Sequence, residues 1–249
     1  MGANESEPRT VFLDFDETVS DQMRFNLLYV REIGRRMAAR HGGDSEAWAK
    51  SAIDMMVAVE EDYVARFVGN PLNGNCEWLA DFRVGSIGLL YKGMGLPVPE
   101  DAARLSLQIQ REALCGCDAA FPGAPEALAA ISSAGHRIHM ASGQESEFLR
   151  GGMTGNGCAR YIDRFFGPDL VGCAKEGPEY YERVFRAVGI SPSEAIVVDD
   201  YPPAIGWALD VGATVVQMRL SSVHHFDVVP GVAAVITDHR DLPNVVMGL

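Results

Sequence analysis

The sequence lacks the features that mark a membrane-spanning or secreted chain. Its 249 residues contain no apolar run of about 18 residues, so no segment is expected to cross a membrane. The first ten residues, MGANESEPRT, have neither the basic nor the apolar region of a signal peptide. These absences predict a cytoplasmic protein.

Basic residues are scarce relative to acidic ones. Lysine and arginine total 21 against 34 aspartates and glutamates, which gives a net charge of −13. A nucleic-acid partner requires a basic face, and an anionic membrane surface attracts one, so the charge argues against both. An anionic substrate would need a cation in its binding site to offset this charge.

Cysteines are few, odd in number and scattered. This pattern is typical of free thiols in a reducing compartment. Two of them are separated by one residue, but no second pair is present to complete a zinc site. The five are Cys76, Cys115, Cys117, Cys158 and Cys173.

Strands and helices alternate along only part of the chain. Residues 10–14 form an apolar strand, and residues 22 to about 120 show helical spacing without the alternation typical of strands. Beyond residue 120, short apolar strands alternate with helices of ten to fifteen residues. This order predicts an α/β protein with a Rossmann-like parallel sheet and helices on both faces.

The long helical stretch directly follows the first strand, which predicts an inserted domain. We expect an α/β core domain made of residues 1–20 and 121–249, and a helical cap domain made of residues 21–120. Because the insertion begins at the tip of the first strand, the cap could fold over that tip as a lid.

Three predicted strands end in polar side chains. Asp14 and Asp16 follow the first strand, Ser142 follows RIHMA, and Asp199 and Asp200 follow AIVV. All carboxyl ends of a parallel sheet lie on one edge, and ligands bind in the crevice outside that edge. We therefore expect Asp14, Ser142 and Asp199 to converge.

The converging residue types favour phosphate chemistry. Several carboxylates in one place repel each other and need a cation, and oxygen ligands of this kind suit Mg²⁺. The Ser142 hydroxyl, the bare N–H of Gly143 at an expected helix start, and the charge of Lys175 could hold phosphate oxygens.

The spacing of Asp14 and Asp16 suits a division of labour. Side chains two positions apart point to the same side of an extended chain, and Thr18 continues that side if the extension lasts. One carboxylate could attack phosphorus while the other protonates the leaving oxygen and then activates water. Asp199 and Asp200 can both reach the site only if the chain turns, which Tyr201-Pro202-Pro203 favours.

Four stretches in order resemble the haloacid dehalogenase superfamily, in its phosphatase branch. They are FLDFDETV, HMASGQ, the lysine of AKEGPEYYERV, and AIVVDDYPPAIGWALDVGA. The resemblance covers residues 10–20 and about 120–218, including the FPGAPEALAAISSAGH lead-in to the second strand.

The resemblance implies roles for the polar residues. Asp14 corresponds to the nucleophile that forms an aspartyl-phosphate, and Asp16 to the general acid/base. Ser142, the N–H of Gly143, and Lys175 correspond to the groups that hold the phosphate.

The resemblance also implies a Mg²⁺ site and a cap. Its ligands would be Asp14, the carbonyl of Asp16, and Asp199, with Asp200 as a nearby helper that binds directly or through water. Residues 22–120 would close over the substrate.

Two positions depart from the family pattern. Val198 stands where a glycine often precedes the first acid of the last motif, and Glu176 separates Lys175 from the proline that often follows it. An acid beside Lys175 could weaken its grip on phosphate. Asp16 separates the branches, because a leaving alkoxide needs a proton and a leaving halide does not.

Other polar or large residues are expected to be less directly involved. His224-His225 is expected to be a surface loop, and His136 and His139 to be packing residues. Met55-Met56 is expected to be core. Possible substrate contacts in the insert are Arg24, Trp78, Arg83 and Lys92.

The predicted function is a Mg²⁺-dependent phosphohydrolase acting on a small phosphorylated metabolite. Neither the substrate nor the oligomeric state follows from the sequence. A phosphomutase or a phosphonate hydrolase on the same core is an alternative, and the latter would need Lys50 or Lys92 to form an imine. The alternative outside the enzymes is a binding protein that has kept this fold but does not turn over a substrate.

Overall fold

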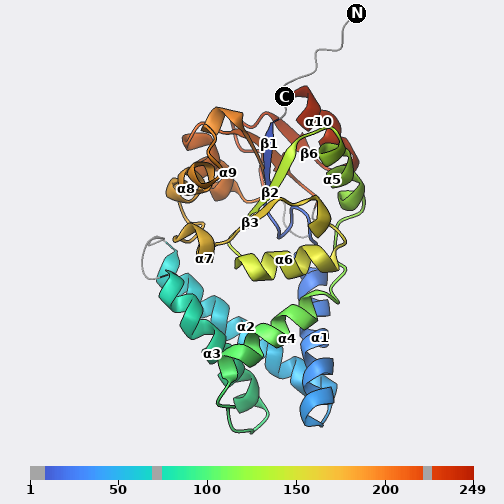
Figure 1. Ribbon diagram of the computed structural model, residues 1–249, viewed down its shortest axis with the longest axis vertical. Helices are drawn as coiled ribbons and strands as arrows, with labels where there is room; N and C mark the ends of the chain where they lie inside the picture. The colour runs from blue at the N-terminus through green and yellow to red at the C-terminus, as the bar shows by residue number, and fades with distance from the viewer. Residues whose placement is uncertain (1–8, 69–74, 221–225) are drawn as a thin grey trace, which may run out of the picture.

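A computed structural model describes residues 9–68, 75–220 and 226–249. Six parallel strands form one sheet in the order β3-β2-β1-β4-β5-β6 (Figure 1). The first strand of the chain therefore lies inside the sheet, between β2 and β4. The strands are β1 (Thr10–Leu13), β2 (Arg137–Ala141), β3 (Arg164–Phe166), β4 (Ala195–Asp199), β5 (Thr214–Met218) and β6 (Ala234–Ile236).

Alternating side chains of the buried strands supply two apolar clusters, one on each face of the sheet. Val11 and Leu13 belong to one cluster and Phe12 to the other, as the period of two requires. Helices cover both faces (Figure 1), which confirms the predicted Rossmann-like α/β architecture.

The helices of the sheet divide between these two clusters. The Val11 side is covered by α5 (Ala124–Ser133), α6 (Ser146–Gly155) and α10 (Leu242–Gly248). The Phe12 side is covered by α8 (Pro178–Val188) and α9 (Pro202–Asp210). A short helix, α7 (Pro168–Val171), precedes the loop that carries Lys175.

The chain between β1 and α5 is helical, as predicted. It forms α1 (Gln22–His41), α2 (Ser45–Phe67), α3 (Asn75–Gly93) and α4 (Ala102–Leu114). Asp21 and Asp44 cap the first two helices by accepting hydrogen bonds from backbone N–H groups of the first turn. The fourth helix begins at Ala102, after a turn at residues 100–101.

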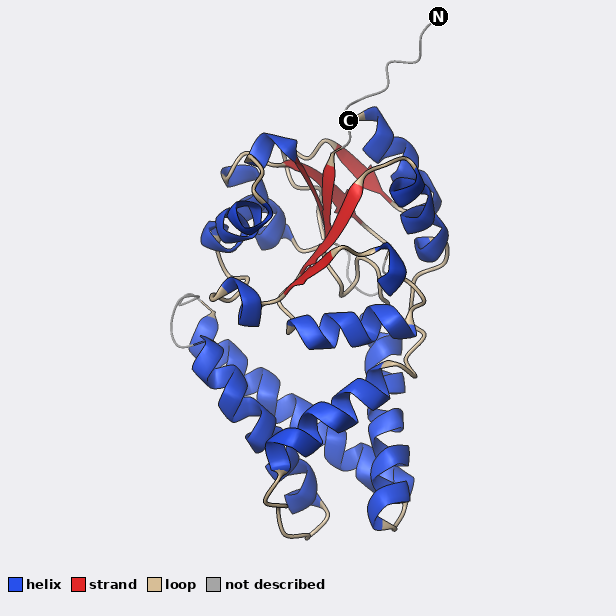
Figure 2. Ribbon diagram, in the orientation of Figure 1, coloured by secondary structure: helices blue, strands red, loops and turns tan. Residues whose placement is uncertain are grey.

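These four helices lie together beyond the carboxyl ends of the strands, and Figure 2 shows strands only in the other part of the molecule. The division at residues 20/21 and 120/121 stays a prediction. Within the described part of the chain, no helix is long and apolar enough to cross a membrane.

Candidate active site

The first strand delivers Asp14 to the carboxyl edge and then turns sharply. The Asp14 N–H still donates to the Val198 carbonyl at 3.0 Å, so the residue continues the strand pairing. Three residues later, Glu17 adopts φ +55°, in the left-handed region. The extended run therefore ends at Asp16, yet the Thr18 hydroxyl reaches Asp200 Oδ1 at 3.3 Å from within the turn.

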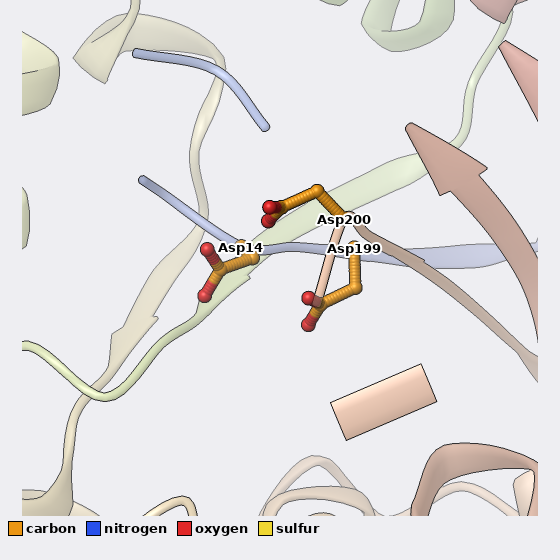
Figure 3. Close-up of side chains that lie close together, drawn as sticks. All are labelled: Asp14, Asp199 and Asp200. Carbon is orange, nitrogen blue, oxygen red and sulfur yellow. The ribbon is translucent and has the colours of Figure 1, made fainter. Parts of the chain in front are cut away.

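Three carboxylates meet at this edge. Asp14, Asp199 and Asp200 each offer an oxygen, and these oxygens lie within 4.8 Å of one another (Figure 3). The chain turns after β4, where the Tyr201 N–H donates to Asp199 Oδ1 at 3.0 Å and α9 starts at the next residue. This turn is what lets two adjacent acids face one site.

Lys175 lies against the acids rather than in solvent. Its Nζ donates to Asp14 Oδ1 at 2.6 Å and to Asp199 Oδ2 at 2.7 Å, and its third hydrogen bond goes to the Ala141 carbonyl at 3.1 Å. The ammonium thus has all three donors satisfied. Burial alone would lower the pKa of Lys175, but attraction by Asp14 and Asp199 raises it well above its usual value.

Glu176, the unusual acid after Lys175, points away from this cluster. Its Oε1 accepts a hydrogen bond from the Tyr63 hydroxyl of α2 at 3.3 Å. The Glu176 carboxylate therefore faces the helical layer, while the ammonium of Lys175 binds the acids at the strand edge.

Asp16 lies beside the cluster but has a different partner. Gln144 Nε2 donates to its Oδ2 at 2.9 Å, and its carboxylate is not among the three that share the acidic cluster. Metal binding by Asp16 through its carbonyl stays a prediction. Gln144 is a site residue that the sequence interpretation missed, although it directly follows Ser142-Gly143.

Burial and mutual repulsion raise the pKa of several acids. Burial raises the pKa of Asp14 to about 6 against the attraction of Lys175. Burial, followed by the charge of Asp14, raises the pKa of Asp16 to about 7. Burial, followed by repulsion from Asp199 and Asp14, raises the pKa of Asp200 to about 8. Lys175 alone therefore does not offset the negative charge of the acids at this edge.

The acid set fits Mg²⁺. Three carboxylate-bearing residues converge at one point, oxygen is the ligand type that Mg²⁺ prefers, and a divalent ion would relieve the repulsion that raises these pKa values. Asp14, Asp199 and Asp200 would hold the ion.

Ser142 lies at the same edge, directly after β2. It is buried, and its hydrogen bonding to Asp14 acts to lower the pKa of that acid. Gly143 is exposed, with open space where a Cβ would stand. The expectation that a helix begins at Gly143 is wrong, because α6 begins at Ser146, whose N–H is taken by Asp169 Oδ1 at 2.8 Å.

Two tyrosines of α8 hold the edge in place and were also missed. Tyr180 donates to the carbonyls of Ser142 and Phe166, at 3.0 and 2.8 Å, and so ties β2 to β3 beside the site. Tyr181 donates to Asp199 Oδ2 at 3.1 Å. Both are buried, and their place in PEYYERV, just after Lys175, was the available signal.

A cavity of about 620 Å³ lies over the acids. Its floor is the strand edge, with Asp14, Asp16, Ser142, Lys175 and Asp199, and its remaining wall comes largely from α1–α4. Met55 and Met56 pack against the apolar core as expected, and they also line this wall.

The other residues considered from sequence divide between cavity and surface. Trp78 lines the cavity, whereas Arg24 and Lys92 are exposed and do not. Arg83 of α3 forms an ion pair with the buried Glu145, which precedes α6. His139 is buried and His136 accepts a hydrogen bond from the Arg9 N–H, so both pack as expected. His224-His225 lies outside the described residues.

The fold and the site together define a Rossmann-like α/β protein with its acids at the carboxyl edge of a parallel sheet. The chain belongs to the haloacid dehalogenase-like hydrolase family, whose model matches residues 8–205. A comparison with curated proteins found no match.

Solved structures of several activities share the fold. A defluorinating L-2-haloacid dehalogenase is 19% identical with a TM-score of 0.67, over 95% of this chain and 94% of that one. A magnesium-bound putative hydrolase of the same superfamily from Bacillus subtilis is 16% identical with a TM-score of 0.60, over 97% and 99%. A phosphatase of the superfamily from Thermococcus onnurineus is 14% identical with a TM-score of 0.57, over 95% and 97%. At these identities the similarity extends to the fold alone.

Proposed function

We propose that this protein is a Mg²⁺-dependent phosphohydrolase that cleaves a small phosphate monoester through an aspartyl-phosphate on Asp14. The single observation that carries the proposal is Asp16. Its carboxyl group lies outside the cluster of Asp14, Asp199 and Asp200, is oriented by Gln144, and has a pKa raised to about 7. Such a group can hold a proton at neutral pH and give it to a leaving oxygen.

The residues divide the reaction into two steps. Asp14 attacks phosphorus, the bond to the ester oxygen breaks, and that oxygen takes the proton of Asp16 as the alcohol leaves. Asp16 then accepts a proton from water, whose oxygen attacks the same phosphorus and releases inorganic phosphate and the free Asp14 carboxylate.

Charge neutralisation carries much of this catalysis, because the transferred group passes through a loose transition state. Lys175 and Ser142 lie against Asp14 and would hold the transferred oxygens. A bound Mg²⁺ would supply further positive charge at that position.

Dehalogenation of a 2-haloacid is the second candidate, because dehalogenases are among the proteins of similar fold. Two features weigh against it. A leaving halide needs no proton from Asp16. Among the described cavity residues, Lys175 is the only lysine or arginine, and it lies against Asp14 at the position of the attack, so the carboxylate of a haloacid would lack a cationic partner elsewhere in the cavity.

A phosphonate hydrolase is less well supported, because it needs a lysine of the insert in the site. Lys50 is exposed and paired with Asp54, and Lys92 is exposed, so neither lines the cavity. Borohydride trapping with an aldehyde substrate tests this alternative, and we expect no trapped adduct.

The proposal is tested with an aryl phosphate in the presence of Mg²⁺, using the wild type and Asp14→Asn. We expect hydrolysis by the wild type, loss of hydrolysis on chelation, and none by the variant, because a carboxamide is neither a nucleophile nor a charged ligand. Chloride release from 2-chloropropionate is measured in parallel. Wild-type rates in the variant, or chloride release without phosphate release, would overturn the proposal.

A further inference from the structure

Part of the cavity lining is aromatic and acidic, and most of it comes from α2 and α3. This aromatic–acid wall consists of Tyr63, Trp78 and Phe82 with Glu60 and Glu176, all of which line the cavity. The Tyr63 and Trp78 ring centroids are 5.7 Å apart, at 62°, and those of Trp78 and Phe82 are 5.3 Å apart, at 23°. Three rings thus line one region of the cavity.

The orientation of these rings is fixed by contacts outside the cavity. The Trp78 indole N–H donates to Asp62 Oδ2 at 2.6 Å, and the Tyr63 ring also packs on Phe67, with centroids 5.3 Å apart. Because the indole N–H is already satisfied, Trp78 contributes its π-surface to the cavity rather than a hydrogen-bond donor. Aromatic faces held in this way attract cations.

The two acids of the wall lack cationic partners. Glu60 lies three residues before Tyr63 on α2, so the two side chains share a face of the helix. Within the described residues, neither Glu60 nor Glu176 forms an ion pair. Burial raises the pKa of Glu176 and nearby Glu60 adds to the rise, so the two carboxyl groups lie within electrostatic reach.

The rest of the cavity supplies no compensating charge. The described lining contains one lysine and no arginine, and that lysine is held by Asp14 and Asp199 at the strand edge. Glu145 is matched by Arg83, whereas Glu60 and Glu176 carry negative charge that no ion pair among the described residues offsets. A second phosphate or a carboxylate on the leaving group would be repelled there.

Resting on the proposed function, we propose that the substrate is a phosphate monoester of an amino alcohol, whose ammonium group binds the aromatic–acid wall while its phosphate binds the strand edge. The two ends of the cavity then have opposite preferences. The strand edge, with Mg²⁺, Lys175 and Ser142, takes the dianionic phosphate. The three rings and two carboxylates take an alkylated cation, which gains from both cation–π attraction and Coulomb attraction.

The test compares choline phosphate with 3,3-dimethylbutyl phosphate, which has the same shape but a carbon in place of the charged nitrogen. We expect kcat/KM to be about tenfold higher for choline phosphate, which is the factor typical of a partly desolvated cation over aromatic rings. p-Nitrophenyl phosphate, measured beside them, reports on phosphate hydrolysis itself.

Matched variants separate the charge of the wall from general effects on α2. In Glu60→Gln/Glu176→Gln the ratio of kcat/KM for choline phosphate to that for 3,3-dimethylbutyl phosphate should fall towards unity. Glu61→Gln, the control, removes the same charge from an exposed residue that does not line the cavity, and should keep the preference. Trp78→Leu should reduce the preference while leaving both carboxylates.

The outcomes distinguish the two proposals. Hydrolysis of all three esters without a preference for the cationic one overturns this inference and leaves the phosphohydrolase intact. If no ester is hydrolysed, the proposed function fails. Calorimetric binding of choline against 3,3-dimethylbutanol then decides the inference: tighter binding of choline that is lost in the double variant supports the cationic site, and equal binding overturns it.

Discussion

The ammonium of Lys175 lies 2.6 Å from Asp14 Oδ1, inside a site where both groups are buried. The same nitrogen contacts Asp199, so one lysine holds together acids that reach the site from β1 and β4. Lys175 thus offsets the negative charge of these buried acids in the folded protein, as Mg²⁺ would in the proposed reaction.

Lys175→Met should therefore destabilise the metal-free protein. Removing one partner from a buried ion pair leaves uncompensated carboxylates, at a cost of about 3 kcal/mol. Mg²⁺ should restore part of this loss, so the rise in Tm on adding Mg²⁺ should be larger in the variant than in the wild type. Thermal unfolding with and without Mg²⁺ measures both effects.

The control for this prediction is Lys50→Met, because Lys50 forms a solvent-exposed pair with Asp54. Exposed pairs contribute little, so its Tm should change little and its response to Mg²⁺ should match the wild type. An identical Mg²⁺ response in Lys175→Met would contradict a role for the lysine in balancing the metal-binding acids.

Asp16→Asn should affect esters according to how much their leaving group needs a proton. Loss of a general acid costs about 10²–10⁴-fold for an alkyl phosphate, whose alkoxide is a poor leaving group. The loss in the first step on p-nitrophenyl phosphate should be much smaller, since that phenolate leaves unprotonated. Because the second step needs Asp16 for both esters, the measurement is the rate of leaving-group release in the first turnover, and an equal loss on the two would remove Asp16 from the acid role.

Arg83→Met should destabilise the contact between α3 and the start of α6. Arg83 is the ion-pair partner of Glu145, whose carboxylate is buried, and an unpaired buried charge costs about 3 kcal/mol. Adding Glu145→Gln should recover much of this loss, because the charge itself is then gone. Urea unfolding of the two single variants and the double variant gives the coupling free energy. Additive losses would show that the pair contributes nothing as a pair.

His139 should make stability depend on pH. Burial lowers the pKa of His139 to about 4, and within the described residues neither ring nitrogen has a hydrogen-bond partner. Below a pH of about 6.5, the ordinary pKa of histidine, His139 is protonated in the unfolded chain but stays neutral in the folded protein. The free energy of unfolding should fall as the pH drops from about 6.5 towards 4, by up to about 3 kcal/mol from this residue.

His139→Leu should reduce that slope, as measured by urea unfolding at several pH values between 4 and 7. His136→Leu is the matched control, since it leaves the buried His139 in place and should retain the contribution of His139. If both variants show the wild-type slope, the buried imidazole is not its source.

Much of the site could be predicted from the sequence because strand direction alone brings the ends of parallel strands to one edge. Asp14, Ser142 and Asp199 follow apolar strands and meet there in the structure. Their convergence requires no knowledge of side-chain packing.

The residues that were missed depend on local geometry that no periodicity reports. Gln144 reaches Asp16 because the chain runs four residues, 142–145, between the end of β2 and the start of α6. Met55 and Met56 have the composition of core residues, and only the placement of α2 over the strand edge turns them into cavity wall. Burial of Tyr181 against Asp199 likewise follows from how α8 packs on the sheet.

Because β1 lies between β2 and β4 in the sheet, it can be paired on both sides only after both of those strands are present. Thr10 pairs with Arg137 on one side and with Ala195 on the other. Both neighbours of β1 are therefore synthesised well after β1 itself. Pairings this distant in sequence form slowly, since much chain must be ordered before they are made. During synthesis β1 stays unpaired until β2 has emerged, and the edge that carries Asp14 and Asp199 is complete only after β4.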